Sequence, residues 1–373
     1  SLLNIIKKDK KNFNIELLTA NKNYSKLIKQ AKFFKVKNII ITDGNSFLIA
    51  SKLLKNTNIK IFKNFDSLNK IFDINKKIDY SMCAISGFQG LKPTLDIIKF
   101  TKTIAIANKE SIICGWNLIK KDLRKYKTYF IPVDSEHFSI WSLLGNNKKN
   151  NFEKIYITAS GGPFRKLPLN QFKNISIRNA LKHPNWSMGK KITIDSATMM
   201  NKVFEIIEAK KIFDFKYNQL KILIHPSSYL HAIVKFDNGL SKLLVHDTNM
   251  TIPIFNSIYF ETDKKLKSKK IDIKILNNLD LQEINHIRFP VIKILNNMSE
   301  KDSLFETIIV SANDKLVSLF LKNKIRYIDI SKILLKICSM AEFNKFRSIK
   351  PKNIKEINDL ADYVSLKIDS ISV

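Results

Sequence analysis

Residues 128–137 read Thr-Tyr-Phe-Ile-Pro-Val-Asp-Ser-Glu-His. The apolar run 128–133 predicts a strand, and Asp134 and Glu136 follow it directly. In an extended or turn segment, alternate side chains point the same way, so these two carboxylates can share one cation. Carboxylate oxygens are ligands that Mg²⁺ and Mn²⁺ prefer in proteins. The sequence therefore predicts a divalent-metal site at the end of this strand.

The residues before this strand alternate short apolar runs with amphipathic, lysine-rich segments. This alternation is typical of a parallel sheet with crossover helices, as in a Rossmann-like domain. The predicted strands cover 14–19, 36–42, 60–62, 81–85 and 103–107. The predicted helices cover 24–34, 46–54, 94–100 and 116–125, and residues 1–8 resemble the end of a further helix.

A second polar stretch, Asp195-Ser196-Ala197-Thr198-Met199-Met200-Asn201-Lys202, leads into Glu205. Its spacing predicts a helix over 198–210, capped by Asp195 or Ser196. Met200, Val203, Phe204 and Ile207 form the expected core side of this helix, Asn201, Glu205 and Glu208 the other side, and Lys202 its edge. We expect Glu205 to be the third metal ligand, beside Asp134 and Glu136. The alternative is that each carboxylate is an ordinary surface residue.

Four polar residues near these carboxylates suit a phosphate group: Ser160, Ser196, Asn201 and Lys202. Ser160 opens the glycine-rich turn Ser160-Gly161-Gly162-Pro163, whose N–H groups can face an anion. Ser196 is predicted at a helix N-terminus, where the helix dipole favours negative charge. The alternative interpretation makes Ser196 only a helix cap and Lys202 a solvated side chain.

Residues 166–193 are polar, contain Pro168 and Pro184, and predict an irregular segment that could act as a lid. His183 and Trp186 within it could close over a small substrate, or Trp186 could only anchor the loop. Lys109 follows a predicted strand and so belongs to the edge of the sheet where ligands bind. His225 and His231 are predicted to be structural.

The remaining sequence completes a division into four parts. Strands are predicted at 154–159, 221–224, 231–236 and 241–244, and helices at 291–295, 304–321 and 328–341. We predict an α/β cofactor-binding domain over 1–133, an α+β catalytic domain over 134–261, a linker over 262–287 and a C-terminal helical bundle over 288–373.

Composition limits the function classes. The formal net charge is +31, but the lysines are spread along the whole chain and arginine occurs at only six positions. A nucleic-acid surface would more often gather its cations and use arginine, so compositional drift, as in an AT-rich genome, is favoured. No apolar run approaches the roughly 20 residues of a membrane helix. Three widely spaced cysteines predict a reducing compartment.

Five motifs in this order resemble one known family, 1-deoxy-D-xylulose 5-phosphate reductoisomerase. They are Ala107-Asn108-Lys109-Glu110-Ser111, Pro132-Val133-Asp134-Ser135-Glu136-His137, Ser160-Gly161-Gly162-Pro163-Phe164, His183-Pro184-Asn185-Trp186-Ser187-Met188-Gly189 and Asp195-Ser196-Ala197-Thr198-Met199-Met200-Asn201-Lys202. Weaker similarity runs from residue 1 to about residue 340.

The resemblance implies an NADPH- and metal-dependent enzyme that rearranges a ketose phosphate and reduces the product to 2-C-methyl-D-erythritol 4-phosphate. It implies a homodimer in a bacterial cytoplasm, or in a plastid-type organelle if the source is eukaryotic, with no nucleic-acid or membrane partner. Implied roles are metal binding by Asp134, Glu136 and Glu205; catalysis by Lys109, Ser135, Glu136 and His183; substrate binding by Ser160, Trp186, Ser196, Asn201, Lys202 and Glu205; and cofactor binding by Asn21, Lys22, Asn23, Asn108 and Gly189.

Four departures from the family pattern stand out. The family's first strand and glycine-rich phosphate loop are missing, so we expect the chain as given to bind NADPH poorly. Val203 replaces a glycine, Asn249 and Thr251 replace an Asp and an Arg, and the segment Val310–Asp314 differs from Asn-Ala-Ala-Asn-Glu. Three other functions stay open: action on another phosphorylated polyol, nucleic-acid binding, and an inactive remnant.

Overall fold

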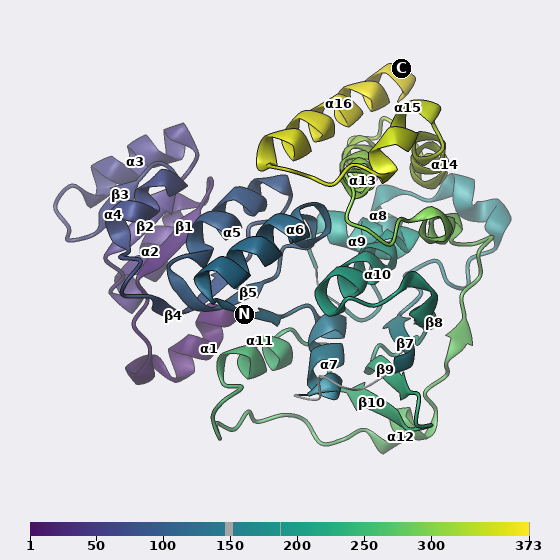
Figure 1. The fold of residues 1–373 in the computed structure, drawn as a ribbon, viewed down its shortest axis with the longest axis horizontal. Coiled ribbons are helices and arrows are strands. Elements are labelled where there is room, and N and C mark those ends of the chain that lie inside the picture. Colours follow the sequence, from purple (N-terminus) through teal and green to yellow (C-terminus); the bar gives the residue numbers. More distant parts are fainter. Residues whose placement is uncertain (146–151, 187, 373) are drawn as a thin grey trace.

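The structure is a computed structural model that describes residues 1–145, 152–186 and 188–372. Two three-stranded parallel sheets form the N-terminal part, a five-stranded mixed sheet forms the central part, and helices form the C-terminal part (Figure 1). The predicted α/β class, with a Rossmann-like first part, an α+β centre and a helical end, is confirmed.

The N-terminal strands are all parallel, as the alternating pattern predicts, but they lie in two sheets rather than one. The orders are β1-β2-β3 and β4-β5-β6. The strands are β1 (Leu17–Ala20), β2 (Asn38–Ile41), β3 (Lys60–Phe62), β4 (Ile78–Cys83), β5 (Thr101–Ile106) and β6 (Tyr129–Pro132). The helices are α1 (Leu2–Lys8), α2 (Tyr24–Phe34), α3 (Gly44–Leu54), α4 (Leu68–Ile71), α5 (Leu91–Ile98) and α6 (Lys109–Tyr126).

Helix α6 begins seven residues before its predicted start because Asn108 caps it. The Asn108 side chain accepts a hydrogen bond from the backbone N–H of Ser111, which satisfies one of the free donors of the first turn. The early start matters for the site, since it places Lys109 at the first position of a helix and directly after β5.

The central sheet has the order β10-β9-β7-β8-β11, in which only β7 and β8 are parallel. Its strands are β7 (Phe152–Ala159), β8 (Leu220–Ile224), β9 (Leu230–Phe236), β10 (Ser241–Val245) and β11 (Gln282–Glu283). Helices α7 (Ser135–Leu144) and α10 (Met200–Phe213) both contact this sheet, and α11 (Thr251–Ile258) contacts α7. This antiparallel arrangement separates the central part from the parallel sheets before it.

Two segments that we expected to be irregular contain short regular elements. Residues 166–193 contain the 3₁₀ helix η4 (Leu169–Asn174), α8 (Ile177–Ala180) and the start of α9 (Lys190–Thr198). The predicted linker 262–287 contains α12 (Ile273–Asn277) and strand β11, which pairs with β8. Short elements of this kind carry little periodic signal, because their backbone is fixed by distant partners.

The predicted helix 198–210 is confirmed as α10, which begins two residues later than predicted and follows a separate helix, α9. Helix α9 ends at Thr198 and α10 begins at Met200, with Met199 between them in the left-handed region at φ 71°. Asp195 and Ser196 therefore lie inside α9 and cap nothing, which corrects the prediction. The side of α10 that carries Glu205 and Glu208 is also buried, at 2% and 1% exposure.

The C-terminal part is helical, as predicted. It comprises η6 (Pro290–Asn297), α13 (Phe305–Leu321), α14 (Tyr327–Cys338), α15 (Ala341–Asn344), η7 (Lys345–Arg347) and α16 (Ile354–Ser372). Helix α13 is buried on most sides, packs against α14, α16 and α6, and so joins this part to the N-terminal sheets. Ile308, Ile309, Ile357 and Val364 are fully buried in this contact region.

Val203, which departs from the family's glycine, is fully buried on α10. We expect Val203→Gly to destabilise the protein by about 3 kcal/mol, since it combines the loss of a buried side chain with the low helix propensity of glycine. Urea-induced unfolding measures this change. Val203→Ala is the matched control and should cost less, because it keeps the helix propensity; equal costs for the two variants would contradict this account.

Candidate active site

Asp134 and Glu136 lie at the N-terminus of α7, not in the extended turn that was predicted. Asp134 is the N-cap residue, and its Oδ1 accepts a hydrogen bond from the backbone N–H of Glu136 at 3.2 Å. Asp134 follows the end of strand β6, so it lies at the carboxyl edge of the sheet (Figure 1). The two carboxylates still face one site, because a cap residue and the second residue of the first turn flank the same helix end.

Glu205, one turn into α10, completes a carboxylate triad. Asp134, Glu136 and Glu205 each offer one oxygen, and these oxygens lie within 4.8 Å of one another. Oε2 of Glu205 is buried and has the Lys202 ammonium group as its ion-pair partner. Three carboxylate oxygens at this spacing fit a divalent cation such as Mg²⁺ or Mn²⁺. The structure thus brings together the three residues predicted as ligands.

Two buried lysines hold these carboxylates in place. Nζ of Lys109 pairs with Asp134 and lies 3.2 Å from Glu205 and 3.4 Å from Glu208. Nζ of Lys202 lies 3.1 Å from Glu136 and also pairs with Glu205. Each ammonium group therefore neutralises part of a cluster that would otherwise repel itself.

The pKa values of the triad separate according to these contacts. Burial disfavours the charged form of Asp134, but Lys109 and His137 outweigh it and hold the pKa well below its ordinary value. Glu136 is also buried, and Lys202 lowers its pKa to about 2. Burial and the charge of Glu136 raise the pKa of Glu205 instead. A divalent cation would favour the ionised form of all three.

His137 and Glu208 belong to this cluster, although the sequence analysis gave them no role. Nδ1 of His137 lies 3.0 Å from Asp134, and its Nε2 lies 2.8 Å from the backbone oxygen of Glu205. His137 thereby joins α7 to α10. The i,i+3 spacing of Glu205 and Glu208 was the signal that could have identified the second residue.

The predicted phosphate residues fall into two groups. Nε2 of His183 lies 3.2 Å from the Ser160 hydroxyl and 3.0 Å from the Ser196 hydroxyl. Asn201 and Lys202 lie in the first turn of α10, and Asn201 donates to Glu205 at 2.5 Å. Ser196 lies near the C-terminal end of α9, so the predicted dipole effect of a helix N-terminus is wrong for this residue.

Trp186 reaches the opposite side of the site. Its ring lies 6.4 Å from that of His231, which stacks on His246 at 3.7 Å. His231 also lies 3.9 Å from Glu136, so it is not only a structural residue of the strand. His225, as predicted, makes structural contacts, with the Leu279 carbonyl and Ser227. Ser187, in the same motif as Trp186, lies outside the described residues.

The predicted cofactor residues lie apart from the triad. Asn21, Lys22 and Asn23 connect β1 to α2; Asn21 donates to Thr42 at 2.9 Å and Asn23 caps α2. Asn108 caps α6 and donates to Gly87 at 2.9 Å. Gly189 is the exposed residue before α9. The turn after β1 is at the carboxyl end of a parallel strand, where nucleotides commonly bind.

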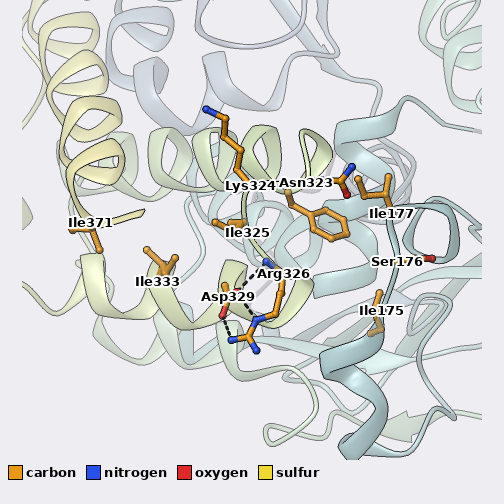
Figure 2. A pocket seen from close by; sticks show the side chains of 11 residues that line it. Ile175, Ser176, Ile177, Asn323, Lys324, Ile325, Arg326, Asp329, Ile333 and Ile371 are labelled. Carbon is orange, nitrogen blue, oxygen red and sulfur yellow. Dashed lines mark hydrogen bonds and ion pairs between the residues drawn. The ribbon is translucent and has the colours of Figure 1, made fainter. Parts of the chain in front are cut away.

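A surface cavity of about 590 Å³ lies elsewhere, between the start of α8, α14 and the C-terminal ends of α13 and α16 (Figure 2). Ile175, Ile333 and Ile371 line it, and Arg326 at its rim pairs with Asp329. None of its lining residues is a predicted site residue. The candidate site is therefore defined by the carboxylates rather than by this cavity.

Comparisons with known proteins agree with this geometry. Family models described as 1-deoxy-D-xylulose 5-phosphate reductoisomerase and its C-terminal domains match residues 1–115, 130–213 and 246–365. The protein of that name from Pelagibacter ubique (strain HTCC1062) is 81% identical over 373 residues, which are 100% of this chain and 96% of the relative. The chain belongs to the 1-deoxy-D-xylulose 5-phosphate reductoisomerase family.

More distant members of the reductoisomerase family are also similar over most of their length. The Sulfurihydrogenibium relative is 36% identical over 93% of this chain and 89% of its own. A reductoisomerase structure with NADPH, fosmidomycin and magnesium has a TM-score of 0.90 and 28% identity, covering 100% of this chain and 94% of its own. The Zymomonas mobilis enzyme with NADPH has a TM-score of 0.87 and 28% identity, covering 100% and 95%.

Among the described residues, none of the helices combines the length and the apolarity that crossing a membrane requires.

Burial and the nearby Lys202 lower the pKa of His183 to about 4. The unfolded chain has an ordinary histidine pKa, about 6.5, so it binds a proton that the folded protein excludes. The contribution of His183 to stability is therefore present above about pH 6.5 and is lost as the pH falls toward 4. We expect the melting temperature of the wild type to fall relative to that of His183→Gln over this range. A constant difference would contradict the low pKa.

Proposed function

We propose that the protein catalyses the NADPH- and divalent-metal-dependent conversion of 1-deoxy-D-xylulose 5-phosphate to 2-C-methyl-D-erythritol 4-phosphate. The single observation that carries the proposal is the carboxylate triad, whose oxygens lie within 4.8 Å, with Lys202 beside it on α10. A site with cation-binding oxygens and an ammonium group fits a phosphorylated polyol better than it fits a nucleic acid or a neutral sugar.

Asp134, Glu136 and Glu205 would hold the metal. When bound, the metal polarises the carbonyl and hydroxyl oxygens of the substrate. Ser135 and Glu136 would contact the substrate hydroxyls, and the Ser135 hydroxyl already donates to Glu136 at 2.5 Å. Lys109, buried beside the triad, would orient the same part of the substrate and keep the carboxylates ionised.

The phosphate group would lie on the His183 side of the site. Ser160 and Ser196 share Nε2 of His183 as a partner. Nδ1 of His183 accepts hydrogen bonds from the backbone N–H groups of Asn185 and Trp186, so in the neutral ring Nε2 carries the hydrogen and can donate to a hydroxyl or an anion. Asn201 and Lys202 would bind the phosphate from the first turn of α10, where backbone N–H groups and the helix dipole also favour negative charge. Trp186 would cover the substrate and exclude water.

NADPH would bind along the carboxyl edges of the parallel strands. Asn21, Lys22 and Asn23 would contact its adenosine end, and Asn108 and Gly189 would contact it nearer the triad. NADPH supplies the hydride for the reduction. This assignment agrees with the proposed division into a cofactor domain (1–133), a catalytic domain (134–261), a connecting segment (262–287) and a helical domain (288–373).

The direct test is NADPH oxidation, followed at 340 nm, with purified protein, Mg²⁺ and 1-deoxy-D-xylulose 5-phosphate. We expect oxidation that requires both the metal and this substrate and that stops on addition of EDTA. Other ketose phosphates serve as controls; faster oxidation with one of them would assign the site to that polyol. Absence of oxidation with every ketose phosphate would contradict the proposal.

Glu205→Gln tests the triad. The substitution keeps the shape of the side chain but removes one anionic ligand, so we expect Mn²⁺ affinity to fall by about 10-fold to 100-fold in isothermal titration. Glu208→Gln is the matched control, because Glu208 lies on the same helix with the same burial and is outside the triad. Equal Mn²⁺ affinities for wild type and Glu205→Gln would remove Glu205 from the site.

Lys202→Met tests the phosphate side of the site. The ammonium group pairs with Glu136 and Glu205, so its removal leaves these carboxylates free for the cation, and we expect tighter Mn²⁺ binding. The loss of a phosphate contact should raise the KM for the substrate by about 10-fold or more. Tighter binding of Mn²⁺ together with weaker binding of the substrate distinguishes this role from general destabilisation, which would weaken the binding of both.

We also propose a homodimer in a bacterial cytoplasm. Strand β10 lies at the edge of the central sheet, and Leu243 on it and Leu240 beside it are 47% and 60% exposed, which supports an interface there. Light scattering after size-exclusion chromatography measures the mass in solution.

A further inference from the structure

Lys191 lies at the centre of an ionic cluster outside the carboxylate triad. Its Nζ is 2.9 Å from Glu110, 3.2 Å from Asp195 and 2.9 Å from Asp314. The three carboxylates come from α6, α9 and α13. Asp195 is also held by Asn313 on α13, whose amide donates to it at 2.7 Å. One ammonium group therefore joins the N-terminal, central and C-terminal parts of the chain.

The ammonium group also reaches a fourth helix. Nζ of Lys191 lies 5.4 Å from the centre of the Phe204 ring on α10, within the range of a cation–π contact. Phe204 is 2% exposed, so its position is fixed by the core. Lys191 itself is 35% exposed, whereas its partner Asp195 is almost fully buried.

Three of these partners are direct sequence neighbours of proposed site residues. Glu110 follows Lys109, Asp195 precedes Ser196, and Phe204 precedes Glu205. Consecutive helical residues point about 100° apart around the helix axis. Lys191 therefore contacts each of these helices on a side next to the one that carries the proposed site residue. Among the described residues, none of its ion pairs includes Asp134, Glu136 or Glu205.

We propose that Lys191 is a positioning residue that sets the separation between the carboxylate side and the phosphate side of the active site. The proposal rests on the function proposed above. Lys109 and Glu205 belong to the carboxylate side, and Ser196 belongs to the phosphate side. A shift of α6 or α9 by a fraction of an ångström would change how one substrate molecule spans both sides.

Asp314, a departure from the family pattern, takes part in this arrangement. An aspartate is one methylene shorter than the glutamate usually found there, and it pairs with Lys191 at 2.9 Å. Within the segment Val310–Asp314, Asp314 pairs with Lys191 and Asn313 donates to Asp195, so these two residues belong to the ionic cluster around Lys191.

The test compares Lys191→Met with Lys191→Arg in the full chain. Methionine keeps much of the side-chain volume but loses the charge, and we expect kcat to fall by about 10-fold or more in folded protein, with partial recovery in the arginine variant. Lys315→Met is the matched control, because Lys315 is a partly exposed lysine on α13, one of the helices that Lys191 contacts, and it pairs with a single carboxylate, Asp369. It should leave kcat and KM unchanged.

Mn²⁺ titration gives a second readout that does not depend on turnover. Removing a positive charge near the triad would by itself strengthen cation binding. We expect the opposite for Lys191→Met, a Kd for Mn²⁺ raised by about 10-fold, because Lys109 and Glu205 lose their fixed positions. Wild-type kcat, KM and Mn²⁺ affinity in folded Lys191→Met would overturn the proposal.

Two further outcomes have to be considered: Lys191→Met does not fold, or the wild type does not oxidise NADPH. If Lys191→Met does not fold, Asp314→Asn releases only α13; we expect its kcat to fall by about 3-fold, and unchanged constants would overturn the proposal. If the wild type does not oxidise NADPH with any ketose phosphate, the proposed function fails. The Mn²⁺ titrations of the wild type and the Lys191 variants then still decide the role of Lys191.

Discussion

Repulsion among three closely spaced carboxylates, Asp134, Glu136 and Glu205, is the constraint on which the site depends. Two unit charges 4 Å apart interact by about 4 kcal/mol at the effective dielectric constant of a protein surface, so an unneutralised triad would be costly. Lys109 and Lys202 offset this repulsion only in part, because burial and the charge of Glu136 still raise the pKa of Glu205. The cluster therefore retains a deficit of positive charge that a divalent cation would supply.

The parallel sheet explains how distant segments meet at this point. Ile106 at the end of β5 pairs with Pro132 at the end of β6, so the two strands end side by side. Lys109 and Asp134 follow these strand ends, each at the start of a helix. The carboxyl edge of the sheet is where such residues converge. Helix α10 then contributes Glu205 from the other side, and His137 fixes α7 to α10.

The sequence predicted the features that depend on local pattern. Alternating apolar runs located the parallel strands, and the composition of residues 134–136 located two of the three carboxylates that cluster in the structure. The sequence did not predict features whose backbone conformation depends on contacts that a local pattern does not reveal. Strand β11 exists because it pairs with β8, and the break between α9 and α10 depends on the left-handed conformation of Met199. Because of this break, Ser196 lies near the end of α9 and not at the start of a helix, as was predicted.

The high net positive charge of the chain is compatible with a well-ordered active site, because the excess lysines and the ion pairs of the site lie in different parts of the molecule. Four lysines at the helix contacts, Lys109, Lys191, Lys202 and Lys211, each pair with at least two carboxylates. The interior clusters are thus balanced or acidic, although the chain has 64 basic and 33 acidic residues. The excess positive charge must lie on the surface, where solvent screens it. Compositional drift toward lysine can therefore change surface positions, while the ion pairs of the site, and with them its geometry, are retained.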